Sequence, residues 1–107
     1  MKDLHFVGTT LEDLRAFPAP ARRVAGYQLS QVQQGLEPDD WRPMPSVGPG
    51  VIEIRLHEEG EFRVFYIAKL ADVIHVLHAF QKKTRETAKK DIDLAKARLK
   101  QIRGSRP

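Results

Sequence analysis

The sequence predicts an α+β fold in which helices support a small, largely antiparallel sheet. Its 107 residues fit a single domain, which we place at residues 1–107. Apolar residues alternate with period two after residue 50, which is typical of strands, and recur at helical spacing on both sides of that region. We therefore expect the order β-α-α-β-β-β-α, with an N-terminal helical hairpin and a C-terminal helix.

The first elements are a strand and a short helix. Residues 4–7 form a short apolar stretch that ends at Gly8, which predicts a strand. Thr9 or Thr10 offers an N-cap for the helix that follows, and acidic side chains lie in its first turn, where the helix dipole favours them. Pro18 interrupts this helix, so we expect it to be short.

A second helix is predicted to begin near Pro20, because proline is accepted in a first helical turn. Its apolar positions recur at helical spacing: Ala21, Ala25, Leu29, Val32 and Leu36. Gly35 is the expected C-terminal stop. Residues 37–50 hold four prolines and two glycines, so we expect a connecting loop, with Trp41 anchoring it to the core.

Three consecutive strands follow, and we expect them to form an antiparallel meander. In residues 51–57 apolar and polar side chains alternate, so that one face carries Ile52, Ile54 and Leu56 and the other carries Glu53, Arg55 and His57. Residues 58–60 are predicted to form a hairpin turn. Residues 62–69 and 73–80 are apolar at nearly every position, as in central strands covered on both sides.

The helical period returns over residues 87–103. One stripe is apolar, comprising Ala88, Ile92, Ala95, Leu99 and Ile102. Most basic side chains lie elsewhere around the helix, at Lys89, Lys90, Lys96, Lys100 and Arg103. We expect this helix to pack one face on the sheet and to present a cationic face to water.

The positive charge is confined to the last quarter of the chain. Residues 1–80 carry 8 Lys and Arg against 11 Asp and Glu, whereas residues 81–107 carry 10 against 3. Such asymmetry indicates a polyanionic partner, namely nucleic acid, an acidic membrane or an acidic protein segment. A solubilising helix surface is the alternative interpretation.

Composition excludes several classes of protein. Cysteine is absent, which excludes disulfides and cysteine-based zinc sites, and no apolar run approaches the roughly 20 residues that a membrane-spanning helix needs. We see no signal peptide and expect a soluble, cytoplasmic protein.

The four histidines, His5, His57, His75 and His78, lack a metal-ligand pattern, and the opposite parity of the last two predicts that they point to opposite faces. We therefore expect neither a metal nor another cofactor.

The strands carry a group of residues suited to acid–base and phosphate chemistry, although no common catalytic motif is present. The candidates are Arg55, Arg63, His78 and Tyr66 on the strands, with Lys82 and Lys83 at the end of the last strand. Arg55 has an alternative role as a partner of Glu53 or Glu61, and His78 and Tyr66 have one as core residues. Arg63 is flanked by apolar residues, so it needs an anion or open solvent.

Together these side chains suggest metal-independent RNA cleavage. In that reaction the 2′-hydroxyl attacks the adjacent phosphorus, which requires a base, cations that stabilise the phosphorane and an acid for the leaving 5′-oxygen. Arginine and lysine supply the cations, and histidine, lysine or tyrosine supplies the proton transfers.

Several segments resemble the HigB branch of the RelE/ParE toxin superfamily, including its phage-derived relatives. They are Val51–Arg55, Phe62–Tyr66 and Val76–Thr84, with Gly35 and Trp41–Pro45 upstream, and the most specific is the H-A-F-x-K-K-T pattern that begins at His78. The resemblance covers nearly the whole chain. It implies a RelE/ParE-like toxin of a type II toxin–antitoxin system that cleaves mRNA on the ribosome and inhibits translation.

The resemblance also implies roles and partners. Arg63 matches the family's phosphate-binding arginine, Arg55 matches a basic catalytic position, and Lys82 and Lys83 match the basic pair after the last strand. His78 and Tyr66 match positions that are catalytic in some relatives only. The implied partners are the ribosome, mRNA and a cognate Xre-type helix-turn-helix antitoxin in a hetero-oligomer, and we expect Lys89, Lys90, Lys96 and Lys100 to bind RNA.

Two other functions remain open from the sequence. A ParE-like inhibitor of DNA gyrase shares the fold but is not a nuclease, and retention of the arginines and of the Lys82–Lys83 pair favours the endoribonuclease. A non-catalytic module that binds RNA or protein through its basic helix is the third possibility.

Overall fold

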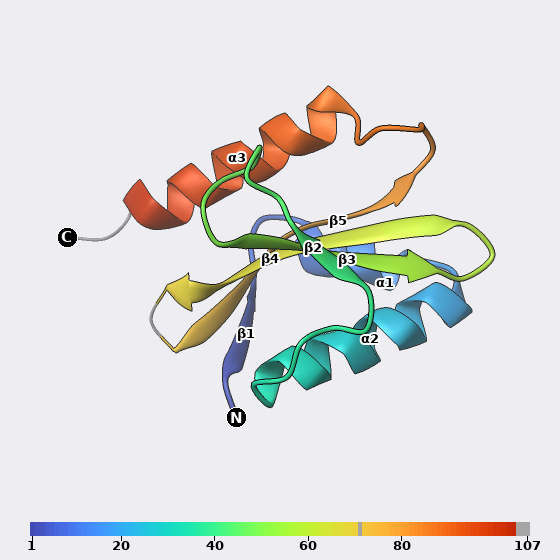
Figure 1. Ribbon diagram of the computed structural model, residues 1–107, viewed down its shortest axis with the longest axis horizontal. Coiled ribbons are helices and arrows are strands. Elements are labelled where there is room, and N and C mark those ends of the chain that lie inside the picture. Colours follow the sequence, from blue (N-terminus) through green and yellow to red (C-terminus); the bar gives the residue numbers. More distant parts are fainter. Residues whose placement is uncertain (71, 105–107) are drawn as a thin grey trace.

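The computed structural model describes residues 1–70 and 72–104, which form a five-stranded sheet with helices on both faces (Figure 1). The elements in chain order are β1 (Asp3–Phe6), α1 (Thr10–Arg15), α2 (Ala19–Gln33), β2 (Trp41–Pro43), β3 (Val51–His57), β4 (Glu61–Leu70), β5 (Val73–Lys82) and α3 (Lys89–Gly104). The strand order is β1-β5-β4-β3-β2; β1 pairs with β5 in parallel and the other pairs are antiparallel. The predicted α+β class and the β3-β4-β5 meander are confirmed.

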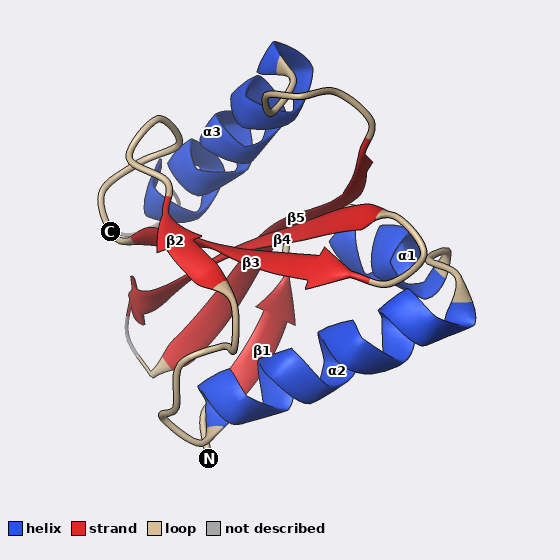
Figure 2. Cartoon of the chain, turned by 45° about the vertical axis from the view of Figure 1, so that its right-hand side comes forward, coloured by secondary structure: helices blue, strands red, loops and turns tan. Residues whose placement is uncertain are grey.

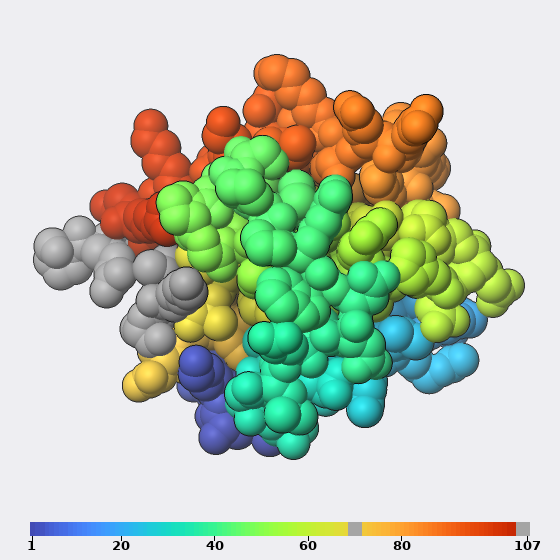
Figure 3. All heavy atoms as spheres, in the orientation of Figure 1, coloured from blue at the N-terminus to red at the C-terminus, as the bar shows by residue number. Residues whose placement is uncertain are grey.

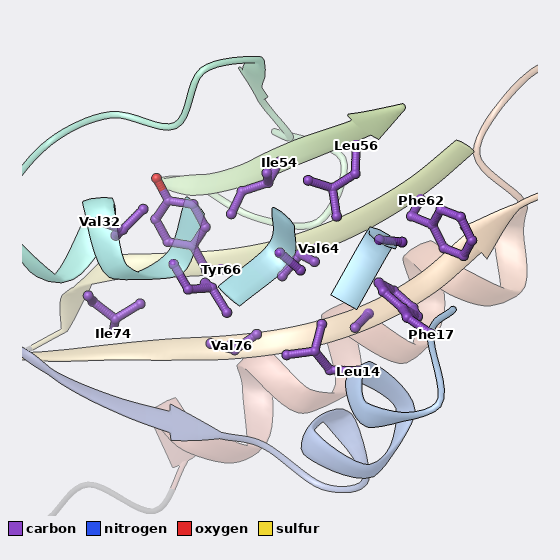
Figure 4. Close-up of a cluster of buried hydrophobic side chains, with 14 residues drawn as sticks. Leu14, Phe17, Val32, Ile54, Leu56, Phe62, Val64, Tyr66, Ile74 and Val76 are labelled. Atoms are coloured by element: carbon purple, nitrogen blue, oxygen red, sulfur yellow. The ribbon is translucent and has the colours of Figure 1, made fainter. Parts of the chain in front are cut away.

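The sheet separates two apolar clusters. Helices α1 and α2 cover one face and α3 covers the other (Figure 2). The cluster under α1 and α2 includes Val32, Ile54 and Val64 (Figure 4), and the cluster under α3 includes Phe65, Leu77 and Leu99. No helix among residues 1–70 and 72–104 has the length and apolar character to cross a membrane.

Helix α2 buries the predicted stripe except at its end. Ala21, Ala25, Leu29 and Val32 are buried, and Gly35 follows the helix with φ of +85°, a conformation that favours glycine. The prediction for Leu36 is wrong, because the helix ends at Gln33 and Leu36 is 56% exposed. The left-handed residue at Gly35 turns the chain before the stripe reaches Leu36.

The predicted loop 37–50 contains an additional strand, β2, which the prediction missed. The backbone groups of Asp40 and Met44 face β3, where the Arg55 amide donates to the Asp40 carbonyl (2.9 Å) and the Met44 amide donates to the Val51 carbonyl (2.9 Å). By alternation Pro43 has its backbone on the outer edge of the sheet, where a proline removes no ladder hydrogen bond. Proline therefore does not exclude a strand here. Trp41 is half-buried on β2, and its indole donates to Glu37 (3.2 Å).

Two predictions about side-chain direction are corrected by packing. Glu53 was expected on a polar strand face, but that face is covered on the α3 side and Glu53 is fully buried. His75 and His78 were expected on opposite faces. A β-bulge in β5 leaves Leu77 without a partner on β4. As a result, His75 pairs with Ile67 and His78 pairs with Phe65. Both of these partners belong to the cluster under α3, so the two histidines lie on the same face of the sheet.

Helix α3 has the predicted two faces. Ala95 and Leu99 are buried, Ile92 and Ile102 are partly buried, and the four lysines expected to bind RNA are exposed. One cation on this helix is buried, because Arg98 donates to the Leu77 carbonyl (2.9 Å) and to the hydroxyls of Thr9 and Thr10 (both 3.0 Å). Arg98 thereby joins α3 to the start of α1 and to β5.

Candidate functional site

An open pocket of about 560 Å³ on the α3 face of the sheet gathers four cationic side chains, Arg42, Arg55, Lys82 and Arg85. We call it the cationic pocket. Its remaining lining residues are Pro43, Met44, Pro45, Ser46, Glu86, Thr87 and Ile92. In Figure 3 the segment around residue 45 (green) and the segment that leads into α3 (orange) lie on the same side of the molecule.

Three strands and one turn supply these cations. Arg42 lies on β2 directly opposite Glu53, Arg55 lies in β3, and Lys82 is the last residue of β5. Because side chains alternate along a strand, these three positions project to the same face of the sheet. Arg85 lies in the segment between β5 and α3. The pocket therefore depends on the β2–β3 pairing that the sequence did not predict.

Arg55 and Arg63 form a like-charged pair across β3 and β4. Their Cα atoms are register partners, so both side chains lie on the pocket face. Like charges placed directly opposite each other destabilise a sheet. Arg55 is half-buried, and its Nε atom is buried without a hydrogen-bond partner in the described part of the chain. The pair concentrates positive charge on this face of the sheet, and an anion beside it would offset the repulsion.

The buried carboxylate of Glu53 compensates part of this positive charge. Glu53 Oε1 accepts from Arg42 Nε (2.9 Å), and Glu53 Oε2 lies 3.7 Å from Arg63 Nε. The Arg63 side chain is only 3% exposed; it also donates to the Phe62 carbonyl (2.9 Å) and to Glu61 Oε1 (3.2 Å). The anion that the sequence required for Arg63 is thus internal. Arg63 lies beneath the pocket and does not line it.

The other predicted site residues are separated from the pocket. His78 is buried; its Nε2 atom pairs with Asp91 Oδ1 (2.8 Å), and its ring stacks on Phe80 with centroids 4.6 Å apart. Burial lowers the pKa of His78, although the Asp91 carboxylate opposes that shift. Lys83 is exposed and does not line the pocket, unlike its neighbour Lys82.

Tyr66 lies on the opposite face of the sheet, among the apolar side chains under α2 (Figure 4). Burial, with a smaller contribution from Glu37, raises its pKa to about 12. Tyr66 and Trp41 line an apolar pocket of about 430 Å³ there. The structure therefore does not bring Tyr66 together with Arg55, Arg63 or Lys82.

The basic face of α3 begins next to the cationic pocket. Ile92 of α3 lines the pocket, Lys90 is exposed in the first turn of the helix, and Lys96 and Lys100 are exposed farther along it. Lys89 is also exposed and pairs with Asp93 (2.8 Å). This arrangement presents positive charge from the pocket along the outer surface of α3.

Sequence reasoning missed two cations of the pocket, Arg42 and Arg85. Arg42 lies within the Trp41–Pro45 segment that carries part of the family resemblance, and Arg85 follows the Lys82–Lys83 pair by two residues. A search for basic residues within the first segment and directly after the Lys82–Lys83 pair would have found both. Within residues 1–70 and 72–104 no group of three or more His, Asp or Glu side chains is arranged to hold a metal ion.

Comparison with known proteins gives one family assignment. Residues 12–100 match the model of a family described as Phage derived protein Gp49-like (DUF891). A comparison with curated proteins finds no match. The matched range includes every strand from β2 to β5 and all four residues that define the cationic pocket.

Proposed function

The chain belongs to the Gp49-like family, which is part of the RelE/HigB-like toxin group, and from this membership we propose a HigB-type toxin of a type II toxin–antitoxin system. Its proposed activity is ribosome-dependent cleavage of mRNA in the cytoplasm. The observation that carries the proposal is the cationic pocket, in which the half-buried Arg55 lies with three further cations, Arg42, Lys82 and Arg85. A cleft of one charge sign concentrates polyanions and strengthens contacts to phosphate.

The proposed reaction needs no metal ion. The substrate 2′-oxygen forms a bond to phosphorus while the bond from phosphorus to the 5′-oxygen breaks. Arg55, with Arg42 and Arg85, stabilises the charge that develops on the phosphorane oxygens. Arg63, which the family resemblance matches to a phosphate-binding arginine, lies beneath the pocket. We therefore propose that it contributes positive potential without contacting the phosphate.

Two pocket residues are suited to the proton transfers. The Glu86 carboxylate accepts the proton of the 2′-hydroxyl, and the Lys82 ammonium donates a proton to the leaving 5′-oxygen; both side chains line the pocket. Lys83 and the α3 lysines hold the RNA outside the pocket. We give His78 and Tyr66 no proton-transfer role, because one is buried against Asp91 and the other faces α2.

The test is to incubate the purified chain with ribosomes and a defined message and to determine the product ends. In-line attack by the 2′-oxygen leaves a 2′,3′-cyclic phosphate and a 5′-hydroxyl, and water can then open the cyclic phosphate to a 3′-phosphate. Products with 3′-hydroxyl ends would contradict the mechanism, because such ends arise from attack by water, as in metal-dependent cleavage. Arrest of DNA supercoiling without RNA cleavage would identify a gyrase inhibitor instead. Absence of both activities would leave a non-catalytic binding module.

A further inference from the structure

His57, the last residue of β3, is held between two carboxylates from different segments. Its Nε2 atom lies 2.7 Å from Asp40 Oδ2, and its Nδ1 atom lies 2.8 Å from Glu61 Oε2. An ionised carboxylate only accepts hydrogen bonds, so both ring nitrogens must donate. Only the protonated imidazolium carries a proton on both nitrogens. The geometry is therefore that of a charged His57.

The Glu61 carboxylate and the Asp40 backbone each contact an arginine of the site. The second oxygen of Glu61 accepts from Arg63 Nη2 (3.2 Å), and Arg63 in turn lies against Glu53, which holds Arg42. Asp40 directly precedes β2, and its carbonyl accepts from the Arg55 amide (2.9 Å). The His57 ring thus joins the end of the β3–β4 hairpin to the segment that carries Arg42 into the pocket.

We propose that His57 is a positioning residue whose protonated ring holds Asp40 and Glu61 and thereby fixes Arg42 and Arg63 in the geometry that binds a polyanion. Loss of one ring proton removes one of the two hydrogen bonds and frees that carboxylate. Pocket geometry then changes with the protonation of a residue that touches no substrate. We call the contacts of His57 with Asp40 and Glu61 the clamp. That the polyanion is RNA rests on the proposed function, whereas the clamp does not.

The charges around His57 support protonation. The hydrogen bonds that the His57 ring makes to Glu61 and then to Asp40 raise the pKa of His57, and burial has a smaller, opposing effect. Glu61 comes from β4 and Asp40 from the segment before β2. Cations on the same face of the sheet are Arg55 and Arg63, with Arg42 on β2 and with Lys82 on β5, which pairs with Glu61. The turn adds Glu58 and Glu59. Since the pKa of His57 is raised, the ring is charged at low pH and loses its proton as the pH rises through that value.

A first experiment contains no RNA and tests the clamp alone. The His57 ring signals and the Nε–H signals of Arg42 and Arg63 are followed by NMR between about pH 5.5 and 9, a range that spans ordinary histidine titration. We expect the arginine signals to shift with the midpoint of the His57 ring, and the shift to disappear in His57→Gln. Arginine signals that do not move in the parent, or that move equally in His57→Gln, would overturn the proposal.

A second experiment measures RNA binding with a short, non-cleavable 2′-O-methyl oligonucleotide. In the parent we expect affinity to fall by about fivefold or more as the pH rises through the His57 midpoint, the lower end of ordinary coupling between two sites. His57→Lys keeps a positive charge and several donors over this range, so its affinity should stay high and flat. His5→Gln removes an exposed histidine on β1 and should retain the parent profile.

The same pH step in His57→Lys as in the parent would refute the positioning role. If the oligonucleotide binds at no pH, the proposed function is contradicted instead. The NMR signals of the arginines, which are measured without RNA, then test the clamp alone.

Discussion

Glu53 decides which arginines of the site are free to bind an anion. Its buried carboxylate contacts both Arg42 and Arg63, and Arg63 is further held by Glu61 and the Phe62 carbonyl. Arg55 has no such partner at Nε, although it faces Arg63 across the strands. Arg63 therefore has a structural role as well as an electrostatic one, and of these two strand partners Arg55 is the one that lines the pocket.

Replacement of Arg63 should reduce stability, whereas replacement of Arg55 should not. Arg63→Ala leaves the buried Glu53 with one partner, and breaking a buried ion pair from one side costs about 3 kcal/mol or more. Arg55→Ala removes the repulsion between like charges, so its free energy of unfolding should equal or exceed that of the parent. Urea denaturation of the two variants measures both effects. An Arg63→Ala variant as stable as the parent would show that Glu53 does not need its second arginine.

His57 and His78 should titrate on opposite sides of the ordinary histidine pKa of about 6.5. Burial lowers the pKa of His78, so its stabilising contribution is complete above 6.5 and is lost as the pH falls through its folded-state value. The carboxylates around His57 raise the pKa of that ring, so its contribution is complete below 6.5 and is lost as the pH rises. NMR titration of the histidine ring signals measures the pKa of His57 and the pKa of His78. A higher pKa for His78 than for His57 would contradict this assignment.

At the scale of elements, α3 is predicted to bind RNA separately from the chemistry. Its lysines project away from the apolar stripe, so Lys90, Lys96 and Lys100 can be replaced by glutamine without disturbing the core. For each of these lysines that binds a phosphate, its replacement should flatten the salt dependence of ribosome binding by nearly one unit of slope. Binding titrations at several salt concentrations measure this effect.

The matched control replaces Arg15, Arg22 and Arg23, three exposed arginines on α1 and α2, with glutamine. This variant loses the same charge but should keep the parent slope. Equal slopes for the two triple variants would mean that α3 is only a solubilising surface.

The sequence predicted the elements better than it predicted their environment. Periodicity located both long helices and the three strands of the meander, because an apolar stripe is a local property of the chain. It missed β2, since a strand of three residues with a proline is recognisable only when β3 lies beside it. It also placed Glu53 on a polar strand face, although Glu53 is buried, because burial of that face depends on packing that no local pattern records.

The candidate site shows the same limit. Arg55 and Lys82 were predicted together and do line one pocket, whereas His78 and Tyr66 were included and lie elsewhere. Strand parity alone is enough to separate Tyr66 from Arg63, which lie an odd number of residues apart on β4. For His78 the decisive fact is its pairing with Asp91 of α3, which only the tertiary structure reveals.

For the whole molecule, the uneven charge predicts a partner that covers the cationic pocket. Residues 81–107 hold the entire positive excess, and a complementary antitoxin segment should carry acidic residues. Co-expression with a helix-turn-helix protein from the adjacent reading frame should restore growth and yield a complex. Glutamine at Arg42, Arg55 and Lys82 should weaken that complex, as measured by calorimetry. Unchanged affinity in the triple variant would place the antitoxin elsewhere.

The central claim is that the cationic pocket cleaves RNA, and single-turnover cleavage of ribosome-bound message by Arg55→Gln tests it most directly. Loss of one donor to a developing oxyanion slows a reaction by about 10²–10³-fold, and we expect that loss at saturating ribosome concentration. Arg23→Gln makes the same chemical change at an exposed position on α2 and should cleave at the parent rate. An Arg55→Gln variant that cleaves as fast as Arg23→Gln would contradict the assignment of catalysis to this pocket.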